Sequence, residues 1–376
     1  MSSLVVFPFK SVEVDLVLRN LTIAATHHAV EEVLGVGTEG ATTAIVAETA
    51  GAIESETDTR VSVAIQERIG IHRPGKGDAM NTAMRRFLDS SHRYLHFYDA
   101  DITNFDHDWI DAAESAATGG FDVVRHYFPR ASTDAMITWM VTRPGFALAH
   151  PTSLLWRIAQ PLGGELLMVR SAVEHLVSDP RVAERSDWGI DTMITFATVA
   201  AGLDIAEVFI TDGKQHSLYG SLEDLRLMVV ECFAAMASVR SAPLLSPGRY
   251  HVDPSAPAGD EVTTKVGYSL ETTLPLLTDG WSDDEVELAV SVPFGHELVR
   301  NRDSIHFEFA DGDCWREILS GLLDLADPAN ATWQSVIFRF WVARVLAYTT
   351  TTALGGHGYA MGELETLVSD YAAGAV

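Results

Sequence analysis

Short apolar runs alternate with amphipathic stretches over residues 4–210, and this alternation is the feature that most constrains the fold. Brief apolar runs are typical of buried strands, whereas longer stretches with a 3.6-residue period are typical of helices. We expect strands at residues 4–9, 33–37, 61–67, 94–99, 122–127, 165–169 and 206–210. We expect helices at residues 14–26, 42–53, 77–90, 108–117 and 188–201. Strands that alternate with helices form βαβ units, so the pattern predicts an α/β fold with a mostly parallel sheet.

The character of the chain changes after about residue 220. Residues 222–239 have the pattern of a long helix, and residues 246–260 form a Pro- and Ser-containing linker. Further helices are expected at residues 272–277, 283–290, 315–325 and 333–353. We therefore expect a catalytic α/β domain at residues 1–220 and a mostly helical C-terminal domain at residues 221–376. The helical part would cover the site or hold a homo-oligomer together.

Composition excludes several classes of protein. The formal net charge is −26, from 52 acidic and 26 basic residues, so nucleic acid is not an expected partner. No apolar run reaches the 18 residues of a membrane span. Cys232 and Cys314 do not make a disulfide framework, and the N-terminus lacks the basic region of a signal peptide. These features lead us to expect a cytoplasmic protein with no membrane partner.

A D-x-D motif follows one of the expected strands, in the sequence Y-L-H-F-Y-D-A-D of residues 94–101. Ligands of open α/β sheets bind outside the carboxyl ends of the strands. The pleat of a strand would send the side chains of Asp99 and Asp101 to the same side. Hard divalent cations prefer oxygen ligands and leave positions open for phosphate oxygens. Solvated turn residues are the alternative, but the strand that precedes the motif favours a cation site.

A glycine- and lysine-containing loop, R-P-G-K-G-D at residues 73–78, leads into an expected helix. Gly75 and Gly77 would let the backbone approach a ligand, and a helix N-terminus favours an anion. Lys76 would add a positive charge. The loop lacks the Walker A pattern, and an ordinary turn before a helix stays open as its interpretation.

His216 lies just after the last expected strand, in K-Q-H-S-L-Y-G at residues 214–220. A lone histidine is more often structural, but imidazole can complete a cation site that a carboxylate begins. The availability of Asp101 favours that role. Asp191, at the start of an expected helix, is either an N-terminal cap or a carboxylate of the site.

An arginine- and hydroxyl-rich segment occupies residues 125–138. Arg130 could bind a carboxylate with a bidentate fork, and Thr138 could bond a neighbouring alcohol. The alternative is a capped helix start, with Arg130 in a surface ion pair of little energetic value. Further along the chain, Gly163 and Gly164 separate two apolar stretches, which indicates a tight backbone approach. Together, these motifs indicate a nucleotide-sugar glycosyltransferase in which one cation bridges a nucleoside diphosphate.

Seven segments carry a resemblance to a known family. They are LVVFPFK (4–10), RPGKGDAMN (73–81), FYDADI (97–102), VRHYFPRASTDAMITW (124–139), QPLGGELLM (160–168), SDWGIDT (186–192) and LRLMVVECFAA (225–235). The chain resembles the bacterial mannosylglycerate synthases, which are retaining glycosyltransferases of the GT-A fold. The resemblance implies transfer of mannose from GDP-mannose to D-glycerate, giving the compatible solute α-mannosylglycerate. It also implies a divalent metal cofactor, Mg²⁺, Mn²⁺ or Ca²⁺.

The resemblance also implies roles for individual residues. Metal ligation would fall to Asp101 and His216, with Asp99 turned toward the ribose. The donor would be bound by Pro8, Lys10, Gln66, Lys76, Asp99, Ala100, Asp101, Gly164, Tyr219 and Met228. The acceptor would be bound by Arg130, Asp134, Ala135, Thr138 and Leu162. The catalytic residues would be Asp191, Arg130 and Lys76. The chain departs from the family pattern at Val12 and Thr38, both near the nucleotide end, where donor preference would be set.

Retention of configuration needs either a carboxylate nucleophile or attack from the face that the diphosphate leaves. Asp99 and Asp101 are already assigned to nucleotide and metal, so we expect the front-face route, with Asp191 orienting the sugar. Three alternatives stay open at this point. The same fold could use GDP-glucose, a UDP-sugar or another 2-hydroxy acid. A nucleotidyltransferase would release pyrophosphate, and a non-catalytic protein would bind a nucleotide sugar without transferring it.

Overall fold

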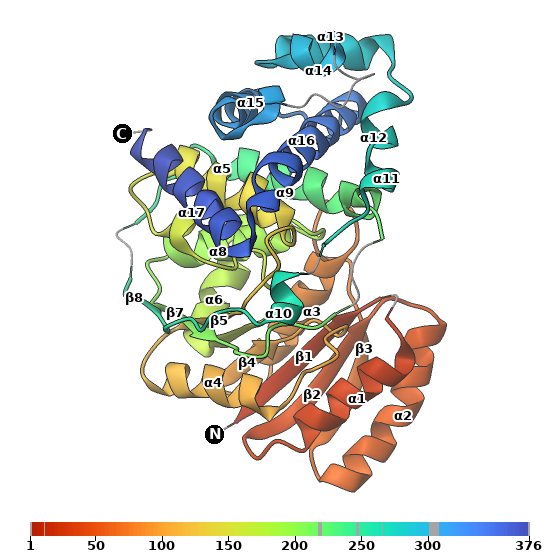
Figure 1. Ribbon diagram of the computed structural model, residues 1–376. Coiled ribbons are helices and arrows are strands. Elements are labelled where there is room, and N and C mark those ends of the chain that lie inside the picture. Colours follow the sequence, from red (N-terminus) through yellow and green to blue (C-terminus); the bar gives the residue numbers. More distant parts are fainter. Residues whose placement is uncertain are drawn as a thin grey trace. The chain divides into compact units, whose positions relative to one another are not determined.

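The computed structural model describes residues 2–10, 12–216, 220–245, 248–264, 266–300 and 308–374 (Figure 1). The chain forms two compact units that alternate along the sequence. The first, here called the sheet unit, comprises Met1–Pro129, Leu162–Ser217 and Pro243–Ala256. The second, the helical unit, comprises Arg130–Pro161, Leu218–Ala242 and Pro257–Val376. This alternation does not test which residues fold as independent domains, so the expected boundary near residue 220 stays a prediction.

The sheet unit is built on an eight-stranded sheet with the strand order β3-β2-β1-β4-β6-β5-β7-β8. Its strands are β1 (Ser3–Phe9), β2 (Val30–Gly37), β3 (Arg60–Ile65), β4 (Tyr94–Phe97), β5 (Val123–Tyr127), β6 (Leu166–Val169), β7 (Ile205–Phe209) and β8 (Tyr250–Val252). Only β6 runs against its neighbours, pairing antiparallel with β4 and β5, while every other pair is parallel. The expectation of a mostly parallel α/β sheet is confirmed.

Helices cover the sheet of this unit, and their apolar positions explain where they lie. The helices are α1 (Val14–Ala25), α2 (Ala41–Thr57), α3 (Lys76–Leu88), α4 (His107–Thr118), α6 (Arg170–Ser178), α7 (Pro180–Ala183) and α8 (Ile190–Ala200). Alternate residues of β1, namely Val5, Phe7 and Phe9, join one buried cluster with apolar residues of α1, α2 and α4. A strand points successive side chains to opposite faces, so these three helices share one face of the sheet. Figure 1 shows α1 and α2 side by side there.

The helical unit is organised around α16, whose sequence is apolar on nearly all sides. A helix of this kind is stable only when other elements surround it, and residues from Trp333 to Thr349 are largely buried. The longer helices of this unit are α5 (Arg143–Ala149), α9 (Arg226–Val239), α13 (Asp283–Ser291), α14 (Gly295–Arg300), α15 (Gly312–Asp324), α16 (Ala331–Thr351) and α17 (His357–Ala373). The short ones are α10 (Asp260–Thr263), α11 (Leu270–Thr273) and α12 (Pro275–Thr278), with the π-helix η1 (Thr138–Thr142) and the 3₁₀ turns η2 (Leu155–Arg157), η3 (Leu222–Leu225), η4 (Glu308–Ala310) and η5 (Ala353–Gly355).

Two expectations for the secondary structure need correction. The stretch expected to be a linker, residues 246–260, contains β8, which pairs in parallel with β7. The strand expected at residues 94–99 ends at Phe97, so Asp99 and Asp101 lie in a turn rather than on the pleat.

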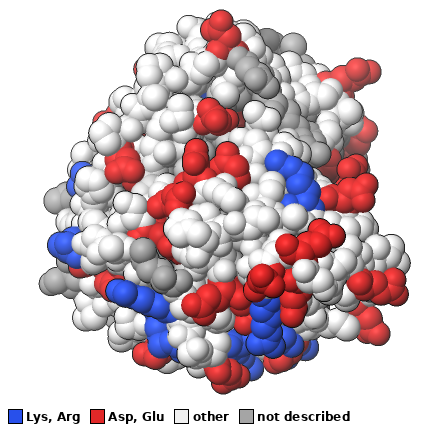
Figure 2. Space-filling view, turned by 90° about the horizontal axis from the view of Figure 1, so that it is seen from below, with Lys and Arg blue, Asp and Glu red and all other residues white. Residues whose placement is uncertain are grey.

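Among the described residues, no helix has the length and apolar character that crossing a bilayer requires. Figure 2 shows one face of the molecule, on which acidic side chains are spread among fewer basic ones.

Candidate active site

A buried asparagine fixes the turn that carries the D-x-D motif. Nδ2 of Asn20, on α1, donates to the carbonyl oxygens of Ala100 at 3.1 Å and of Ile102 at 2.9 Å. The Asn20 residue is fully buried, so these two bonds are shielded from water. The pleat argument for Asp99 and Asp101 is therefore wrong, because both residues lie beyond β4, in a turn whose carbonyl groups at Ala100 and Ile102 are bound by α1. Sequence reasoning missed Asn20, although an asparagine on the apolar face of a helix is an unusual choice.

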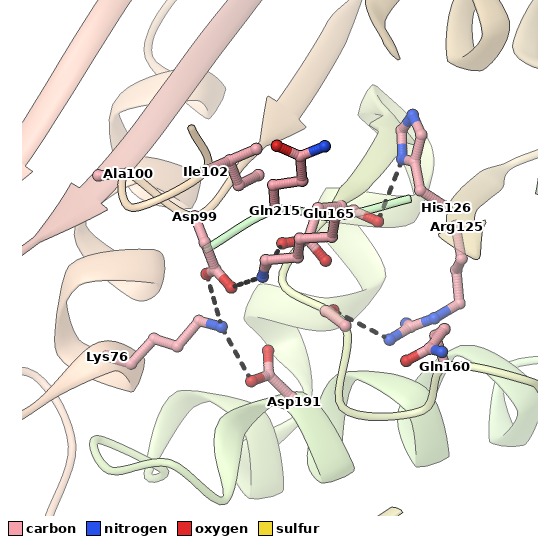
Figure 3. A network of polar contacts seen from close by, with 12 residues as sticks. Lys76, Asp99, Ala100, Ile102, Arg125, His126, Gln160, Glu165, Asp191 and Gln215 are labelled. Carbon is pink, nitrogen blue, oxygen red and sulfur yellow. Dashed lines mark hydrogen bonds and ion pairs between the residues drawn. The ribbon is translucent and has the colours of Figure 1, made fainter. Parts of the chain in front are cut away.

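Lys76, Asp99 and Asp191 meet in the sheet unit, as Figure 3 shows. Nζ of Lys76 lies 3.1 Å from Oδ1 of Asp99 and 3.0 Å from Oδ2 of Asp191. The Lys76 side chain is only 8% exposed. Burial alone would lower the pKa of Lys76, but the two carboxylates outweigh it and raise that pKa. Lys76 is the first residue of α3 and Asp191 lies in the first turn of α8. The ion pair between them therefore joins the N-termini of two helices.

A second lysine extends this network. Nζ of Lys214 lies 2.6 Å from Oδ2 of Asp99 and 2.6 Å from Oε1 of Glu165, whose side chain is fully buried. Burial would raise the pKa of Asp99, but Lys214 and Lys76 together hold it well below its usual value. Burial raises the pKa of Glu165, and Lys214 offsets only part of that effect. The result is an alternating chain of charges in which both lysines contact Asp99. Sequence reasoning did not assign roles to Lys214 or Glu165.

Gly164 leaves room for the contact between Lys76 and Asp99. A Cβ atom at this position would lie 2.6 Å from Nζ of Lys76 and would overlap the carboxylate of Asp99. The preceding residue, Gly163, accepts a hydrogen bond on its carbonyl oxygen from Nη2 of Arg125 at 3.3 Å. The expectation of a tight backbone approach at this Gly-Gly pair agrees with the packing, and the atoms that approach belong to the charge network.

The loop at residues 73–78 is held by the carboxylate of Asp78. Asp78 is fully buried and accepts hydrogen bonds from the backbone N–H groups of Ile69 at 3.0 Å and Gly70 at 2.9 Å. At Gly77, a Cβ atom would overlap the carbonyl group of Arg185. Gly77 is thus required for packing against the segment before α8, which brings Lys76 close to Asp191.

The two candidate metal ligands lie on loops that are hydrogen-bonded to each other. The backbone N–H of Thr103, two residues after Asp101, donates to the carbonyl oxygen of Gln215 at 2.8 Å. Nδ2 of the next residue, Asn104, donates to the carbonyl oxygen of Gly213 in the same loop at 2.9 Å. His216 is the residue after Gln215 in this loop. The loop after β7 is therefore hydrogen-bonded to the D-x-D turn. The donor candidate Tyr219 lies outside the described residues.

Several donor candidates lie at the carboxyl ends of β1 and β3. Pro8 is in β1 opposite Val36, and the exposed Lys10 follows that strand. Gln66 follows β3, where its backbone N–H donates to the carbonyl oxygen of Gly37 at 2.8 Å. Among the described residues, no hydrogen bond or ion pair joins these three side chains to Lys76 or Asp99. Leu162, which is an acceptor candidate, is half-buried and immediately precedes the Gly-Gly pair.

Four of the five acceptor candidates, all except Leu162, lie in the helical unit. Nη1 of Arg130 lies 2.7 Å from Oδ2 of Asp134, and its Nε donates to Oε1 of Gln160 at 3.2 Å. Oδ1 of Asp134 accepts from the backbone N–H of Ala135 at 2.7 Å, where φ is +55°. An alanine rarely adopts this left-handed conformation, so its surroundings must enforce it. Thr138 is buried at the start of η1. Met228 lies half-buried on α9 of the same unit.

The fold of the chain is shared with solved structures. A glucosyl-3-phosphoglycerate synthase from Mycobacterium tuberculosis, in complex with Mn²⁺, UDP-glucose and phosphoglyceric acid, superposes with a TM-score of 0.50 at 21% identity, covering 64% of this chain and 80% of that one. A structure described only as a mycobacterial protein gives a TM-score of 0.50 at 23% identity, covering 72% and 85%. At these identities the likeness describes the fold, which is that of GT-A glycosyltransferases.

Sequence comparisons carry the assignment further. The model for the mannosylglycerate synthase GT domain matches residues 3–238, and the model for the C-terminal domain of that enzyme matches residues 262–368. The mannosylglycerate synthase of Rhodothermus marinus is 47% identical over 374 residues, covering 98% of this chain and 94% of that protein. The one from Selaginella moellendorffii is 44% identical over 373 residues, covering 97% and 88%.

The fold and these relatives define the chain as a glycosyltransferase with a GT-A fold. The chain belongs to the mannosylglycerate synthase family. The resemblance that the sequence motifs indicated is confirmed.

Proposed function

We propose that this chain transfers mannose from GDP-mannose to D-glycerate with retention of configuration, forming α-mannosylglycerate. Both curated relatives are named mannosylglycerate synthase, and together they match nearly the whole chain. Within the site, the observation that carries the proposal is a buried carboxylate oxygen of Asp191 that has no hydrogen-bond partner among the described residues.

Asp191 is 4% exposed, and its Oδ2 is bound by Lys76. Its other oxygen, Oδ1, is buried with no hydrogen-bond partner among the described residues. A buried acceptor left unpaired costs about 1–3 kcal/mol, more when it is charged. A hydroxyl group of the donor sugar would remove this cost by donating to Oδ1. Asp191 is therefore the residue that we assign to orienting the mannose.

Lys76 would bind the diphosphate of the donor. An ammonium group has three N–H donors, and Asp99 and Asp191 take two of them. The third would be available to a phosphate oxygen, next to the positive end of α3. The remaining donor-binding proposals are Pro8, Lys10, Gln66, Asp99, Ala100, Asp101, Gly164, Tyr219 and Met228.

A divalent cation would bind at Asp101 and His216. Asp101 is partly exposed, and its carboxylate has no hydrogen bond or ion pair with the described residues. Carboxylate and imidazole together suit several divalent metals, and the glucosyl-3-phosphoglycerate synthase structure contains Mn²⁺. The donor set therefore fits a cation of this class. When bound, the cation supplies a Lewis acid that neutralises charge on the departing diphosphate.

The acceptor carboxylate would be bound by Arg130, whose guanidinium is oriented by Asp134 and Gln160. A planar guanidinium matches a carboxylate with two parallel hydrogen bonds. Ala135, Thr138 and Leu162 are further acceptor-binding proposals, in which the Thr138 hydroxyl would bond an alcohol group of glycerate. Glycolate and lactate share the carboxylate and the adjacent hydroxyl, so they are the natural competitors.

The transfer would follow a front-face route. The bond from the anomeric carbon to the phosphate oxygen breaks, and a bond to the glycerate hydroxyl oxygen forms on the same face. The hydroxyl proton passes to the departing diphosphate oxygen. Lys76 stabilises the charge on that diphosphate, and Asp191 holds the sugar. No enzyme carboxylate attacks the sugar in this scheme, so no glycosyl-enzyme adduct forms.

The test is nucleoside diphosphate release from GDP-mannose, GDP-glucose and UDP-glucose, each with and without D-glycerate and with Mg²⁺ or EDTA. Release from GDP-mannose that requires both glycerate and the cation supports the proposal. Release only from another donor would move the substrate while keeping the chemistry, and would implicate Val12 and Thr38. Pyrophosphate release from a nucleoside triphosphate, or binding without turnover, would overturn the proposal.

A further inference from the structure

Lysine is rare in this chain. Lys10, Lys76, Lys214 and Lys265 are the only lysines among 26 Lys and Arg residues. Two of these, Lys76 and Lys214, lie in the same network, and each side chain is only 8% exposed. An ammonium is a compact point charge with three rotatable donors, whereas a guanidinium is a wide planar fork. Most basic residues of this chain are arginines. At Lys76 and Lys214 a compact ammonium lies between two carboxylates, and we take this arrangement as the reason for lysine at both positions.

Lys214 connects three segments of the sheet unit. It comes from the loop after β7, and its Nζ contacts Asp99 on the turn after β4 and Glu165 just before β6, each at 2.6 Å. Figure 3 labels Asp99 and Glu165, and the ammonium of Lys214 contacts both carboxylates. Without that ammonium, two carboxylates would face each other in a buried site. Removing one partner of a buried ion pair leaves an uncompensated charge and is strongly unfavourable.

The loop that carries Lys214 is attached to the D-x-D turn at a second point. Gly213 and Gln215, the neighbours of Lys214, are bonded to Asn104, and Thr103 donates to Gln215 at 2.8 Å. Two of these outer bonds use the side-chain amide of Asn104 and the third joins backbone groups. Thr103 and Gln215 are exposed, so water competes with the bonds that they make. The buried lysine is the inner attachment, and His216 follows two residues later.

We propose that Lys214, with Glu165 as its buried counter-ion, is a positioning residue for the divalent cation. Its two ion pairs hold the loop of His216 against the turn of Asp101, so that both ligands are in place before the cation arrives. The inference rests on the proposed function, which assigns the cation to Asp101 and His216. It adds that the affinity for the cation depends on a lysine that does not itself contact the cation.

The experiment measures Mn²⁺ binding by electron paramagnetic resonance, with Mn²⁺ alone and with Mn²⁺ plus GDP, in the absence of acceptor. Spin-echo modulation from ¹⁴N then reports whether an imidazole is bound to the Mn²⁺. The variants are Lys214→Met and His216→Ala, the latter giving the background from GDP. We expect Lys214→Met to raise the Mn²⁺ Kd at least tenfold and to reduce the ¹⁴N modulation toward the His216→Ala level.

The matched control is Arg249→Met. Arg249 pairs with Asp204 at 2.7 Å, next to the opposite end of β7, and is 59% exposed. Losing this ion pair should leave the Mn²⁺ Kd within twofold of the wild-type value. Lys214→Arg and Glu165→Gln serve as further variants, and a thermal melt of each establishes that it is folded. A guanidinium is wider than the ammonium that makes both 2.6 Å contacts, so Lys214→Arg should shift the loop and raise the Kd severalfold. Glu165→Gln should raise the Kd about threefold.

The outcomes separate the two claims. If His216→Ala loses Mn²⁺ while the folded Lys214 and Glu165 variants keep wild-type affinity and full ¹⁴N modulation, the positioning role is wrong and the cation site stands. If the wild type binds no Mn²⁺, or His216→Ala binds it unchanged, the proposed cation ligands are wrong and the inference falls with them. Should Lys214→Met be unfolded, Lys214→Arg and Glu165→Gln decide.

Discussion

Nζ of Lys76 lies 3.0 Å from Oδ2 of Asp191, although the two residues are 115 positions apart in the chain. Asp99 lies 3.1 Å from the same ammonium, so one buried cation is shared by two carboxylates. Because the carboxylates raise the pKa of Lys76, its positive charge persists throughout the neutral pH range. The site thus holds a fixed positive charge where the account places the departing diphosphate.

Lys76→Met should abolish transfer and lower the free energy of unfolding by about 3 kcal/mol, because it leaves Asp99 and Asp191 buried without their counter-ion. The double variant Lys76→Met/Asp191→Asn should recover part of the stability but none of the activity. Urea unfolding and a diphosphate-release assay check both statements. Equal stability of the single and the double variant would contradict the shared-cation account.

Gly164→Ala should lower kcat/KM for the donor at least tenfold, because the new methyl group would lie 2.6 Å from Nζ of Lys76 and would displace Asp99. The matched control is Gly51→Ala on α2, where a Cβ atom meets nothing within 4 Å. That change should leave activity unaltered and stabilise the helix by about 0.5–1 kcal/mol. Steady-state kinetics of both variants test the prediction, and wild-type kinetics for Gly164→Ala would refute it.

Asn20→Ala should destabilise the protein by about 1–3 kcal/mol, since the carbonyl oxygens of Ala100 and Ile102 would lose their buried donor. The same change should raise the KM for the donor, because it frees the turn that carries the D-x-D motif. Asn330→Ala is the control: it removes the N-cap of α16 in the helical unit, at about 1 kcal/mol. An unchanged donor KM in Asn20→Ala, or a KM raised equally by the control, would argue against the positioning of the turn by α1.

Stability should fall in mild acid, in part because of His126. Burial lowers the pKa of His126 to about 4 from the usual 6.5, and its Nε2 lies 2.8 Å from the carbonyl oxygen of Trp109. Between these two pKa values the unfolded chain binds a proton that the folded chain does not. The free energy of unfolding therefore decreases as pH falls from about 6.5 to about 4, by about 3 kcal/mol in total for this group. Urea unfolding at pH 7.5 and 4.5 should show a smaller loss in His126→Gln than in the wild type; equal losses would exclude this origin.

Metal removal gives a further expected result. EDTA should stop transfer completely, and Mg²⁺ or Mn²⁺ should restore it. His216→Ala should need at least tenfold more cation for half-maximal rate, because the imidazole is one of only two proposed protein ligands. A titration of rate against cation concentration measures this. Full activity in EDTA would remove the cation from the account.

Much of the sheet could be predicted because its strands are continuous apolar runs between polar helices. The expected strand at residues 122–127, for example, is β5 (Val123–Tyr127). β8 could not be found this way, since Tyr250–Val252 is a short strand with two exposed residues and no apolar run. Its pairing with β7 comes from the tertiary structure alone.

The candidate site, like the sheet, could be predicted only in part. Lys76, Asp99 and Asp191 each stood out from local motifs, but no spacing rule says that one ammonium joins both carboxylates. Lys214 lies in the loop that we considered as a site because of His216. Glu165 follows the Gly-Gly pair that we considered because it predicts a tight backbone approach. Their roles depend on a contact across three loops, which periodicity does not encode.

The measurement that tests the central claim most directly is proton NMR of GDP-mannose and D-glycerate incubated with the protein and Mg²⁺. The account predicts α-linked mannosylglycerate appearing in step with GDP, and neither product when glycerate or Mg²⁺ is omitted. A β-linked product, or GDP released with free mannose as the only sugar, would contradict retaining transfer to glycerate.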